Sequence, residues 1–412
     1  MRGAPGPREV VVRDLLWQNI VLEPAAARVV DTPAFQRLRY VRQLGHAFLV
    51  YPGATHTRFE HVLGAYGLAQ RALAGLRHRG ALQGLDEREA LRIRLGALLH
   101  DIGHYPFSHA LEESGFTSHE TIGERLLGEG DLAAALGEAG FHDPARDFGA
   151  LIHGASDHPL AGLISGSIDV DKIDYLKRDA KMCGVPYGEV DVDRLLACLT
   201  LVDEEGRRRI GMLEKGAAAL ESLLFAKYQM YRNVYWHHAV RSATAMFKRL
   251  VHEAVADRVL DPATLVAATD DWLMRDLEQH DRTGIAQALR GRALYKRALE
   301  LAPVELPAPV PAWVRGDPAR LARAEDALAR SVGLGPAELL IDVPFKESML
   351  GVDLPIVRSD GSVERLTGQG WPGRMDLPPI ADTLAESACR IRVFTRRRVV
   401  LEPQQLVEAL RT

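Results

Sequence analysis

The residues LLHDIGHYPFSH occupy positions 98–109 and continue the apolar run that begins at Leu95. An imidazole and a carboxylate stand side by side at His100 and Asp101, and two further histidines, His104 and His109, follow closely. Polar groups at the end of an apolar helix are costly to bury unless a partner satisfies them. That partner is either a hydrogen-bonded neighbour in the core or a divalent cation, for which imidazole and carboxylate are suitable ligands. If further ligands lie elsewhere in the chain, the stretch predicts a metal site that activates water.

The composition is that of an ordinary globular protein. The chain has 412 residues, 47% hydrophobic and 26% charged, which is enough for a sizeable core and two or three domains. The net charge of −4 argues against a polyanion-binding role for the whole chain but allows a local basic pocket. The three cysteines form no CxxC pair, which argues against thiolate zinc sites and disulfides and favours a reducing, cytoplasmic location. The sequence shows no signal-peptide core and no membrane span.

The hydrophobic pattern predicts a mostly helical domain with a little β structure. Residues 1–9 are expected to be a flexible tail, and short strands are expected at 10–12 and 20–22. Helices are expected to begin near Pro24 and Pro33, with Asp31 or Thr32 as the cap of the second. A hairpin is expected at 199–213. Further helices are predicted at 59–80, 86–100, 120–127, 132–139, 159–165, 169–179 and 216–258.

A change of composition divides the last part of the chain. Four prolines between residues 301 and 311 predict a linker or a surface crossing. A helix near 318–331 and strand-like runs at 339–343 and 390–394 predict an α+β region. We therefore expect a helical domain at 10–250 and a C-terminal α+β region at 251–412.

Two other segments offer ligands for the predicted metal. His61 opens an apolar helix, where a histidine is also compatible with a helix cap or a surface position. On the helix expected at 169–179, Asp171, Tyr175 and Asp179 share one face with Lys172 beside it. The alternative is a solvated face, but the apolar residues of the same helix indicate that it is packed. Such a face suits an anionic ligand that carries hydroxyl groups.

The ordered series of these motifs resembles a known family. The motifs are DTPAFQRLRYVRQLG at 31–45, YPGA at 51–54, RFEH at 58–61, GHYPFSH at 103–109 and the segment 168–179. Together with His61, the His100-Asp101 pair and Asp171, they resemble the HD phosphohydrolase superfamily, in its dNTP triphosphohydrolase branch. The resemblance covers roughly residues 10–245 and implies a mostly α HD-domain helical bundle.

The resemblance implies a role for each matching residue in the chemistry. His61, His100, Asp101 and Asp171 would bind one divalent metal ion (Mn, Fe, Zn, Ni or Mg), with positions left open for water and a phosphate oxygen. The second set would contain the acid that protonates the leaving 5′ oxygen, a task suited to histidine. That set comprises His104, His109, Glu112 and His119.

The resemblance also implies contacts with a nucleotide substrate. Arg58 and Lys172 would hold phosphate oxygens. Tyr175 would pack beneath the deoxyribose and crowd a 2′ hydroxyl. Gln43 and Asp179 would contact the 3′ hydroxyl, with Leu44 against the sugar. The stretch 227–238 resembles the helix that closes the pocket and would place Lys227 near phosphate and Tyr235 near the base or sugar, although an aromatic core stripe also explains it.

Partners follow from the same resemblance. Members of the family are homo-oligomers, so we expect one here. Asp31, Gln36 and Arg39 match positions that read a guanine activator, but the strand 10–13 lacks the lysine that helps bind its phosphates. Trp236 replaces a polar residue beside the substrate, so the base preference is expected to differ. The arginines at 390–398 allow a nucleic-acid contact, but they are more typical of a strand edge protected by charge.

The sequence leaves three hypotheses for function. The first is a metal-dependent phosphohydrolase that converts dNTPs to deoxynucleoside and triphosphate. The second is another HD phosphohydrolase, acting on nucleoside monophosphates, ribonucleotides or a nucleotide signal. The third is a nucleotide-sensing or nucleic-acid-binding module with a vestigial site. The third is expected to have lost a ligand or a histidine, and no such loss is seen here.

Overall fold

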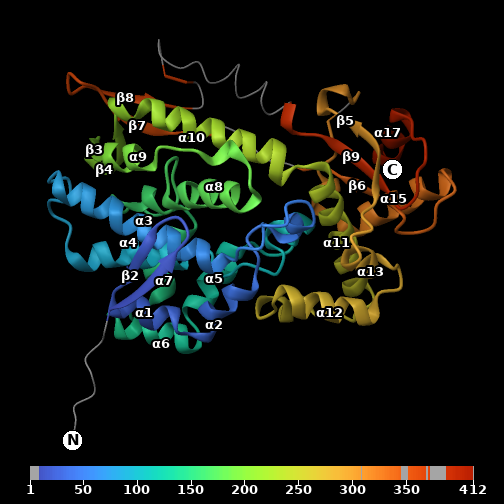
Figure 1. The fold of residues 1–412 in the computed structure, drawn as a ribbon, viewed down its shortest axis with the longest axis horizontal. Helices are drawn as coiled ribbons and strands as arrows, with labels where there is room; N and C mark the ends of the chain where they lie inside the picture. Colours follow the sequence, from blue (N-terminus) through green and yellow to red (C-terminus); the bar gives the residue numbers. More distant parts are fainter. Residues whose placement is uncertain (1–8, 308, 345–350, 368–369, 372–386, 412) are drawn as a thin grey trace, which may run out of the picture.

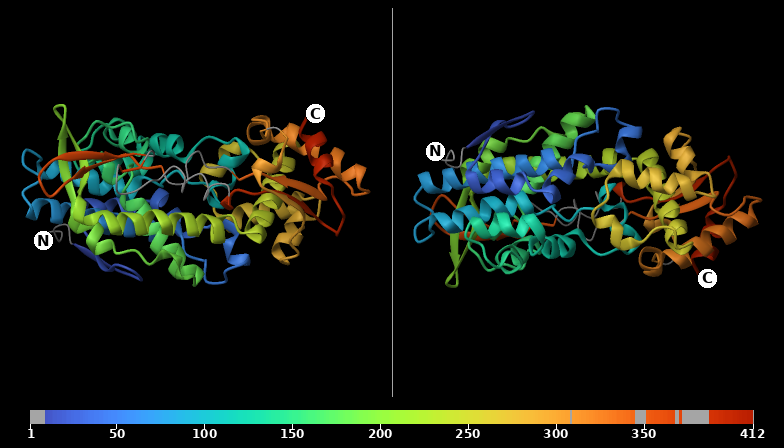
Figure 2. Two further views of the ribbon diagram at one scale, coloured as in Figure 1. Left: turned by 90° about the horizontal axis from the view of Figure 1, so that it is seen from above. Right: turned by 90° about the horizontal axis from the view of Figure 1, so that it is seen from below.

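A computed structural model describes residues 9–307, 309–344, 351–367, 370–371 and 387–411. The tail expected at the N-terminus therefore lies almost entirely outside the described residues. The molecule is elongated, with a helical bundle at one end and most of the C-terminal part of the chain at the other, while the strands at 354–357 and 363–366 (β7 and β8) lie at the bundle end (Figures 1 and 2). The predicted mostly helical fold with a small N-terminal β element and a C-terminal α+β region is confirmed.

Three helices form the centre of the bundle and carry most of the chemistry-bearing residues. They are α3 (Arg58–His78), α4 (Glu87–Leu99) and α8 (Val170–Cys183). Most of α3 is buried, since it packs against both of the others. Each helix begins at a capped end: Glu60 accepts the Thr57 N–H at 2.6 Å, Asp86 the Glu89 N–H and Asp169 the Lys172 N–H, both at 2.8 Å.

A two-stranded ribbon precedes the bundle, as predicted. Strands β1 (Val10–Asp14) and β2 (Gln18–Leu22) pair antiparallel and bury Ile20 and Leu22. Helices α1 (Pro24–Val30) and α2 (Pro33–Gln36) follow, each with proline in its first turn. The predicted side-chain cap of α2 is wrong: the Thr32 hydroxyl donates to the Val29 carbonyl at 2.7 Å, so it completes the end of α1 instead.

Other predicted elements differ from the structure. Residues 159–165 contain only a single tight turn at Ala161–Leu163 instead of the predicted helix. The long helix predicted at 216–258 is two helices, α10 (Ala217–Met230) and α11 (His238–Ala256), joined by a wider turn at Tyr231–Tyr235. The prediction missed helices α7 (Pro144–Ile152) and α9 (Val192–Cys198). Helices α5 (His119–Leu127) and α6 (Gly130–Glu138) agree with it.

One sheet connects the C-terminal part to the helical bundle, and another lies within the C-terminal part. The predicted hairpin, β3 (Leu199–Glu204) and β4 (Arg207–Leu213), is extended by β7 (Leu354–Val357) and β8 (Val363–Leu366), with β4 and β7 parallel. A second sheet has the order β5 (Lys296–Leu301), β9 (Ile391–Thr395), β6 (Leu339–Asp342). The remaining C-terminal helices are α12 (Asp270–His280), α13 (Ile285–Arg290), α14 (Trp313–Gly316), α15 (Pro318–Ser331) and α17 (Pro403–Arg411).

A second core joins the histidine-rich stretch to the C-terminal part. Phe107 packs on Phe247 of α11, with ring centroids 4.5 Å apart, and stacks on His46 at 4.3 Å. Leu273 and Leu277 of α12 belong to the same core. The loop after α4 is therefore held from the side of the C-terminal part. The boundaries predicted at residue 250 and at 301–311 stay predictions.

His46 makes the stability of this core depend on pH. Burial, aided by the charge of Arg42, lowers the pKa of His46 to about 3, whereas an unfolded histidine titrates near 6.5. Below that pH the unfolded chain binds a proton that the folded chain refuses, so the free energy of unfolding falls by about 1.4 kcal/mol per pH unit. His46→Phe should remove about 2 kcal/mol of the loss between pH 7 and pH 5, measured by urea denaturation. The exposed-site variant His142→Gln should keep the wild-type pH dependence; equal dependence in all three proteins would contradict the prediction.

Candidate active site

The residues predicted to bind metal converge from three helices. His61 lies in the first turn of α3, His100 and Asp101 follow the end of α4, and Asp171 lies in the first turn of α8. His61 Nε2 lies 3.2 Å from His100 Nε2, 3.1 Å from Asp171 Oδ1 and 3.5 Å from Asp101 Oδ2. Atoms bound to one ion at about 2.1 Å lie about 3 Å apart when adjacent. The spacing of His61, His100 and Asp101 therefore fits ligands of a single ion, and Asp171 lies close to the two histidines of this cluster.

The hydrogen bonds on the far sides of the two rings support a cation between them. His61 Nδ1 lies 2.9 Å from Asp174 Oδ2, and His100 Nδ1 lies 2.8 Å from the Ala97 carbonyl oxygen. Both partners only accept hydrogen bonds, so each Nδ1 carries a proton, and each ring, when neutral, turns its Nε2 lone pair inward. Two lone pairs that face each other at 3.2 Å repel unless a cation or a proton lies between them.

The pKa shifts of the surrounding groups also favour a positive charge between His61 and His100. Burial opposes a charge on His61, yet its hydrogen bonds to Asp171 and Asp174 raise its pKa to about 10. Burial also opposes ionisation of Asp101, but the neighbouring Arg58 holds the pKa of that carboxyl well below its usual range. The pocket thus concentrates negative charge that needs a positive occupant. A divalent metal satisfies this need and leaves the imidazoles neutral.

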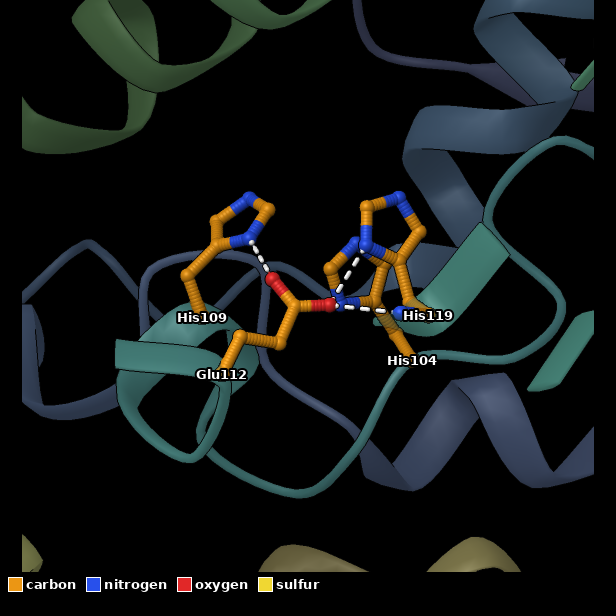
Figure 3. Close-up of side chains that lie close together, drawn as sticks. All are labelled: His104, His109, Glu112 and His119. Carbon is orange, nitrogen blue, oxygen red and sulfur yellow. Dashed lines mark hydrogen bonds and ion pairs between the residues drawn. The ribbon is translucent and has the colours of Figure 1, made fainter. Parts of the chain in front are cut away.

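A second group of side chains follows His100 and Asp101 in the sequence (Figure 3). His104, His109, Glu112 and His119 place their ligand-type atoms within 4.8 Å of one another, as do His61, His100 and Asp101. The Glu112 carboxylate accepts from His119 Nδ1 at 2.6 Å and from His109 Nδ1 at 2.7 Å. Because Glu112 is occupied by these two hydrogen bonds, we interpret this group as proton-carrying rather than metal-binding.

The charges in this second group are unequal. Burial lowers the pKa of His119, but the hydrogen bond and charge of Glu112 outweigh it, so the net pKa is raised. The pKa of Glu112 is lowered, because the two histidines overcome its burial. His104 is fully buried and stacks on His119, with centroids 3.8 Å apart, and burial together with Arg58 lowers its pKa well below the usual range. At neutral pH the group therefore holds a neutral His104 beside a readily protonated His119.

One cavity of about 570 Å³ connects both groups to the predicted sugar face. Asp179 lines it two helical turns after Asp171 on α8, and its carboxylate accepts from Tyr235 at 2.7 Å and contacts His56 Nε2 at 2.8 Å. Gln43 is buried and its Oε1 has no hydrogen-bond partner among the described residues. The predicted residues that line this cavity are Gln43, Leu44, Arg58, His100, Asp101, His104, His109, Glu112, His119, Asp171, Lys172, Tyr175, Asp179 and Tyr235.

The predicted phosphate ligands occupy different surroundings. Arg58 is buried, contacts Asp101 and Ser108, and leaves its Nε without a partner among the described residues. Lys172 Nζ donates to the Gly166 carbonyl at 2.9 Å and contacts Asp169. Lys227 is buried in α10 and is not among the residues that line the cavity.

Comparison with known proteins identifies the family. The sequence model of the HD domain family matches residues 58–179, which contain the proposed metal ligands. The sequence model of the HD associated region matches residues 190–370. The chain belongs to the HD-domain phosphohydrolases. An uncharacterized protein of Methanocaldococcus jannaschii is 32% identical over 97% of this chain and 81% of its own length. The deoxynucleoside triphosphate triphosphohydrolase SAMHD1 of Homo sapiens is 28% identical over 55% of this chain and 42% of its own length.

Solved structures share the HD-domain fold. A phosphohydrolase of Bacteroides thetaiotaomicron superposes with a TM-score of 0.74 at 20% identity, covering 95% of this chain and all of that one. A hypothetical protein of Aquifex aeolicus gives 0.72 at 26% identity, covering 98% of this chain and all of that one. Because these matches include nearly the whole chain, the C-terminal part belongs to the shared fold. No helix within the described part of this HD-domain protein is long and apolar enough to cross a membrane.

The sequence reasoning missed residues that orient the site. Asp174 accepts from His61 Nδ1 and is itself held by Arg178 of α8, whose Nε lies 2.8 Å from its Oδ2. His56 contacts Asp179 from the loop before α3. Asp174 lies one helical turn after Asp171, so the spacing on α8 could have indicated it. His56 offered no such signal, because its partner is far away in the sequence.

Proposed function

We propose that this HD-domain protein hydrolyses deoxynucleoside triphosphates to deoxynucleoside and triphosphate. The observation that carries the proposal is that one cavity is lined by residues of three groups: the proposed metal ligands, the histidine group with Glu112, and the residues around Asp179 and Gln43, which we call the hydroxyl-binding face. The SAMHD1 relatives are named as deoxynucleoside triphosphate triphosphohydrolases, which supports the same substrate class. The matched region spans about half of those relatives' length, so their activity is carried over here as part of the proposal.

In the proposed reaction, water adds to the α-phosphorus and the bond from this phosphorus to the 5′ oxygen breaks. His61, His100, Asp101 and Asp171 would hold one divalent metal, which supplies a more acidic water and charge neutralisation at the phosphate. Arg58 and Lys172 would bind phosphate oxygens from the chain itself. The departing 5′ oxygen must gain a proton to leave as a neutral nucleoside.

His119 is the proposed donor of that proton. The hydrogen bond and charge of Glu112 outweigh burial and raise the pKa of His119, which favours the protonated ring, and Glu112 fixes the ring through Nδ1, which leaves Nε2 as the atom that donates. His109 shares the same carboxylate and is more exposed. His104 stacks on His119 and would hold the ring plane in place.

The hydroxyl-binding face would select the sugar. Asp179 is fixed by His56 and Tyr235 but retains lone pairs, and the free carbonyl of Gln43 adds an acceptor. A buried acceptor left without its hydroxyl is unfavourable, so nucleotides that lack the 3′ hydroxyl would bind poorly. A nucleotide activator and a homo-oligomeric state are further predictions of the family resemblance.

The test is a product analysis. The purified protein is incubated with Mn²⁺ and panels of dNTPs, NTPs and nucleoside monophosphates, and the products are separated by ion-exchange chromatography. Release of triphosphate with a deoxynucleoside supports the proposal. Inorganic phosphate from a monophosphate, or triphosphate released only from ribonucleotides, would favour another HD phosphohydrolase. Nucleotide binding without turnover would favour a sensing module and contradict the proposal.

Tyr175 should control the choice of sugar. Tyr175 lines the cavity and forms an edge-to-face pair with Tyr235, with ring centroids 6.4 Å apart. We propose that it lies beneath the deoxyribose. Tyr175→Ala should therefore raise the ratio of NTP to dNTP turnover by about tenfold, because space for a 2′ hydroxyl is created. The ratio of kcat/KM values measures this, with Tyr187→Ala, a variant outside the cavity, as control. An unchanged ratio would assign ribose exclusion to another residue.

A further inference from the structure

A buried carboxylate from the C-terminal part holds two loops of the active-site cavity. Asp270 is the first residue of α12 and is 3% exposed. Its Oδ1 accepts the Phe107 N–H at 2.9 Å, and its Oδ2 accepts the Arg42 N–H at 3.1 Å and Arg42 Nη1 at 3.2 Å. We call residues 102–108 the His104 loop and residues 41–45 the Gln43 loop. One side chain thus binds the backbone of both loops.

The His104 loop has a backbone that needs such support. Phe107 and Ser108, two consecutive residues with side chains, have φ values of 58° and 62°, in the left-handed region that such residues rarely adopt. Conformations of this kind persist only where the surroundings enforce them. The Asp270 carboxylate holds the first of these residues, and Arg58 contacts the hydroxyl of the second.

Hydrogen bonds of Arg37 also join the start of α12 to the His104 loop. Arg37 Nη1 donates to the Ala268 carbonyl at 3.0 Å, just before α12. Its Nη2 donates to the carbonyls of Ile102 and His104, at 3.1 and 2.8 Å. The start of α12 is therefore attached to the His104 loop at both ends of that loop.

The two loops also touch each other. Gly45 has a φ of 49°, and a Cβ at this position would lie 3.0 Å from the Phe107 carbonyl oxygen. On the cavity side, the Gln43 loop carries Gln43 and Leu44 and the His104 loop carries His104. Their separation therefore sets the distance between the histidine group and the hydroxyl-binding face.

We propose that Asp270 is a positioning residue for the active site: its carboxylate fixes the His104 loop and the Gln43 loop relative to each other. This extends the proposed function, on which its kinetic part rests. Asp270 contacts neither the proposed metal ligands nor the hydroxyl-binding face, so it acts through the backbones of the His104 loop and the Gln43 loop. The C-terminal part then becomes a structural component of the catalytic site.

The two oxygens of Asp270 allow the two attachments to be separated. Asp270→Asn can retain a carbonyl oxygen for the Phe107 N–H, but it turns an amide donor toward the donors of Arg42. Asp270→Ala removes both attachments. Asp271→Asn is the matched control, because the Asp271 side chain follows directly in α12 and is 63% exposed.

Hydrogen exchange of the full chain, followed by mass spectrometry, tests the proposal without any substrate. Asp270→Asn should increase exchange in peptides that contain the Gln43 loop, and Asp270→Ala in peptides of both loops, with α3 and α4 unchanged. In kinetics with the best dNTP, Asp270→Asn should raise KM about tenfold with a smaller change in kcat, and Asp270→Ala should lower kcat by up to about 10²-fold, at wild-type metal content.

Several outcomes would overturn the proposal. Exchange and kinetics equal to those of Asp271→Asn would show that Asp270 positions neither loop. Exchange that rises throughout the bundle, or loss of helical circular dichroism in both variants, would assign Asp270 to folding alone. If the wild type hydrolyses no nucleotide, the proposed function fails, while the exchange experiment still decides whether Asp270 holds the loops.

Discussion

Asp101→Asn should remove both the bound metal and the turnover of dNTPs. Asp101 is 3% exposed and lies next to the two proposed ligand histidines, with carboxylate oxygens 3.5 Å from His61 Nε2 and 3.5 Å from His100 Nε2. The substitution keeps the shape but removes the charge that balances both the ion and Arg58. Loss of several kcal/mol of transition-state stabilisation corresponds to about 10³-fold or more in kcat.

Two measurements check this prediction. Elemental analysis should find the metal in the wild type and not in the variant, and triphosphate release should fall in parallel. Chelation of the wild type should reproduce the loss, and added Mn²⁺ should restore activity to the wild type only. Asp157→Asn is the control, since the Asp157 side chain is 92% exposed and outside the cavity. Full activity of Asp101→Asn would refute the proposed mechanism.

Glu112→Gln and His119→Asn should lower kcat by about 10²- to 10⁴-fold while the metal stays bound, because they remove the proposed general acid or its support. The carboxylate raises the pKa of His119, so the protonated ring persists to higher pH and activity should fall as the pH rises through that pKa. In Glu112→Gln this raising influence is lost. The alkaline fall in activity should therefore move to lower pH.

A second histidine–glutamate pair in the chain provides the control. His153 Nε2 lies 3.0 Å from Glu124 Oε2, and neither residue lines the cavity. His153→Asn and Glu124→Gln should leave kcat and the pH profile unchanged. If Glu112→Gln keeps the wild-type pH profile, or if its metal content falls together with kcat, the group does not act as the proton donor.

The sequence predicted the helical bundle because its determinants are local. The apolar periodicity and capping residues of α3, α4 and α8 lie within each helix, so their bounds were predicted to within a few residues, apart from the C-terminal end of α8. The same is true of the face of α8 that carries Asp171, Tyr175 and Asp179, which the structure places along one cavity. The division of 216–258 into α10 and α11 was missed, because the apolar pattern continues through the wider turn at Tyr231–Tyr235.

The sequence by itself determined the helical class, the resemblance to the HD phosphohydrolases and the identity of the residues that converge at the metal group, since all of these depend on residue type and short spacing. Only the tertiary structure decided which atoms orient them. Asp174 behind His61, His56 beside Asp179 and Asp270 beneath Phe107 act across 113, 123 and 163 residues of sequence. The helical spacing of α8 indicates Asp174 but not its partner, and the contacts of His56 and Asp270 leave no periodic pattern in the chain, because they form only when distant helices and loops are packed together.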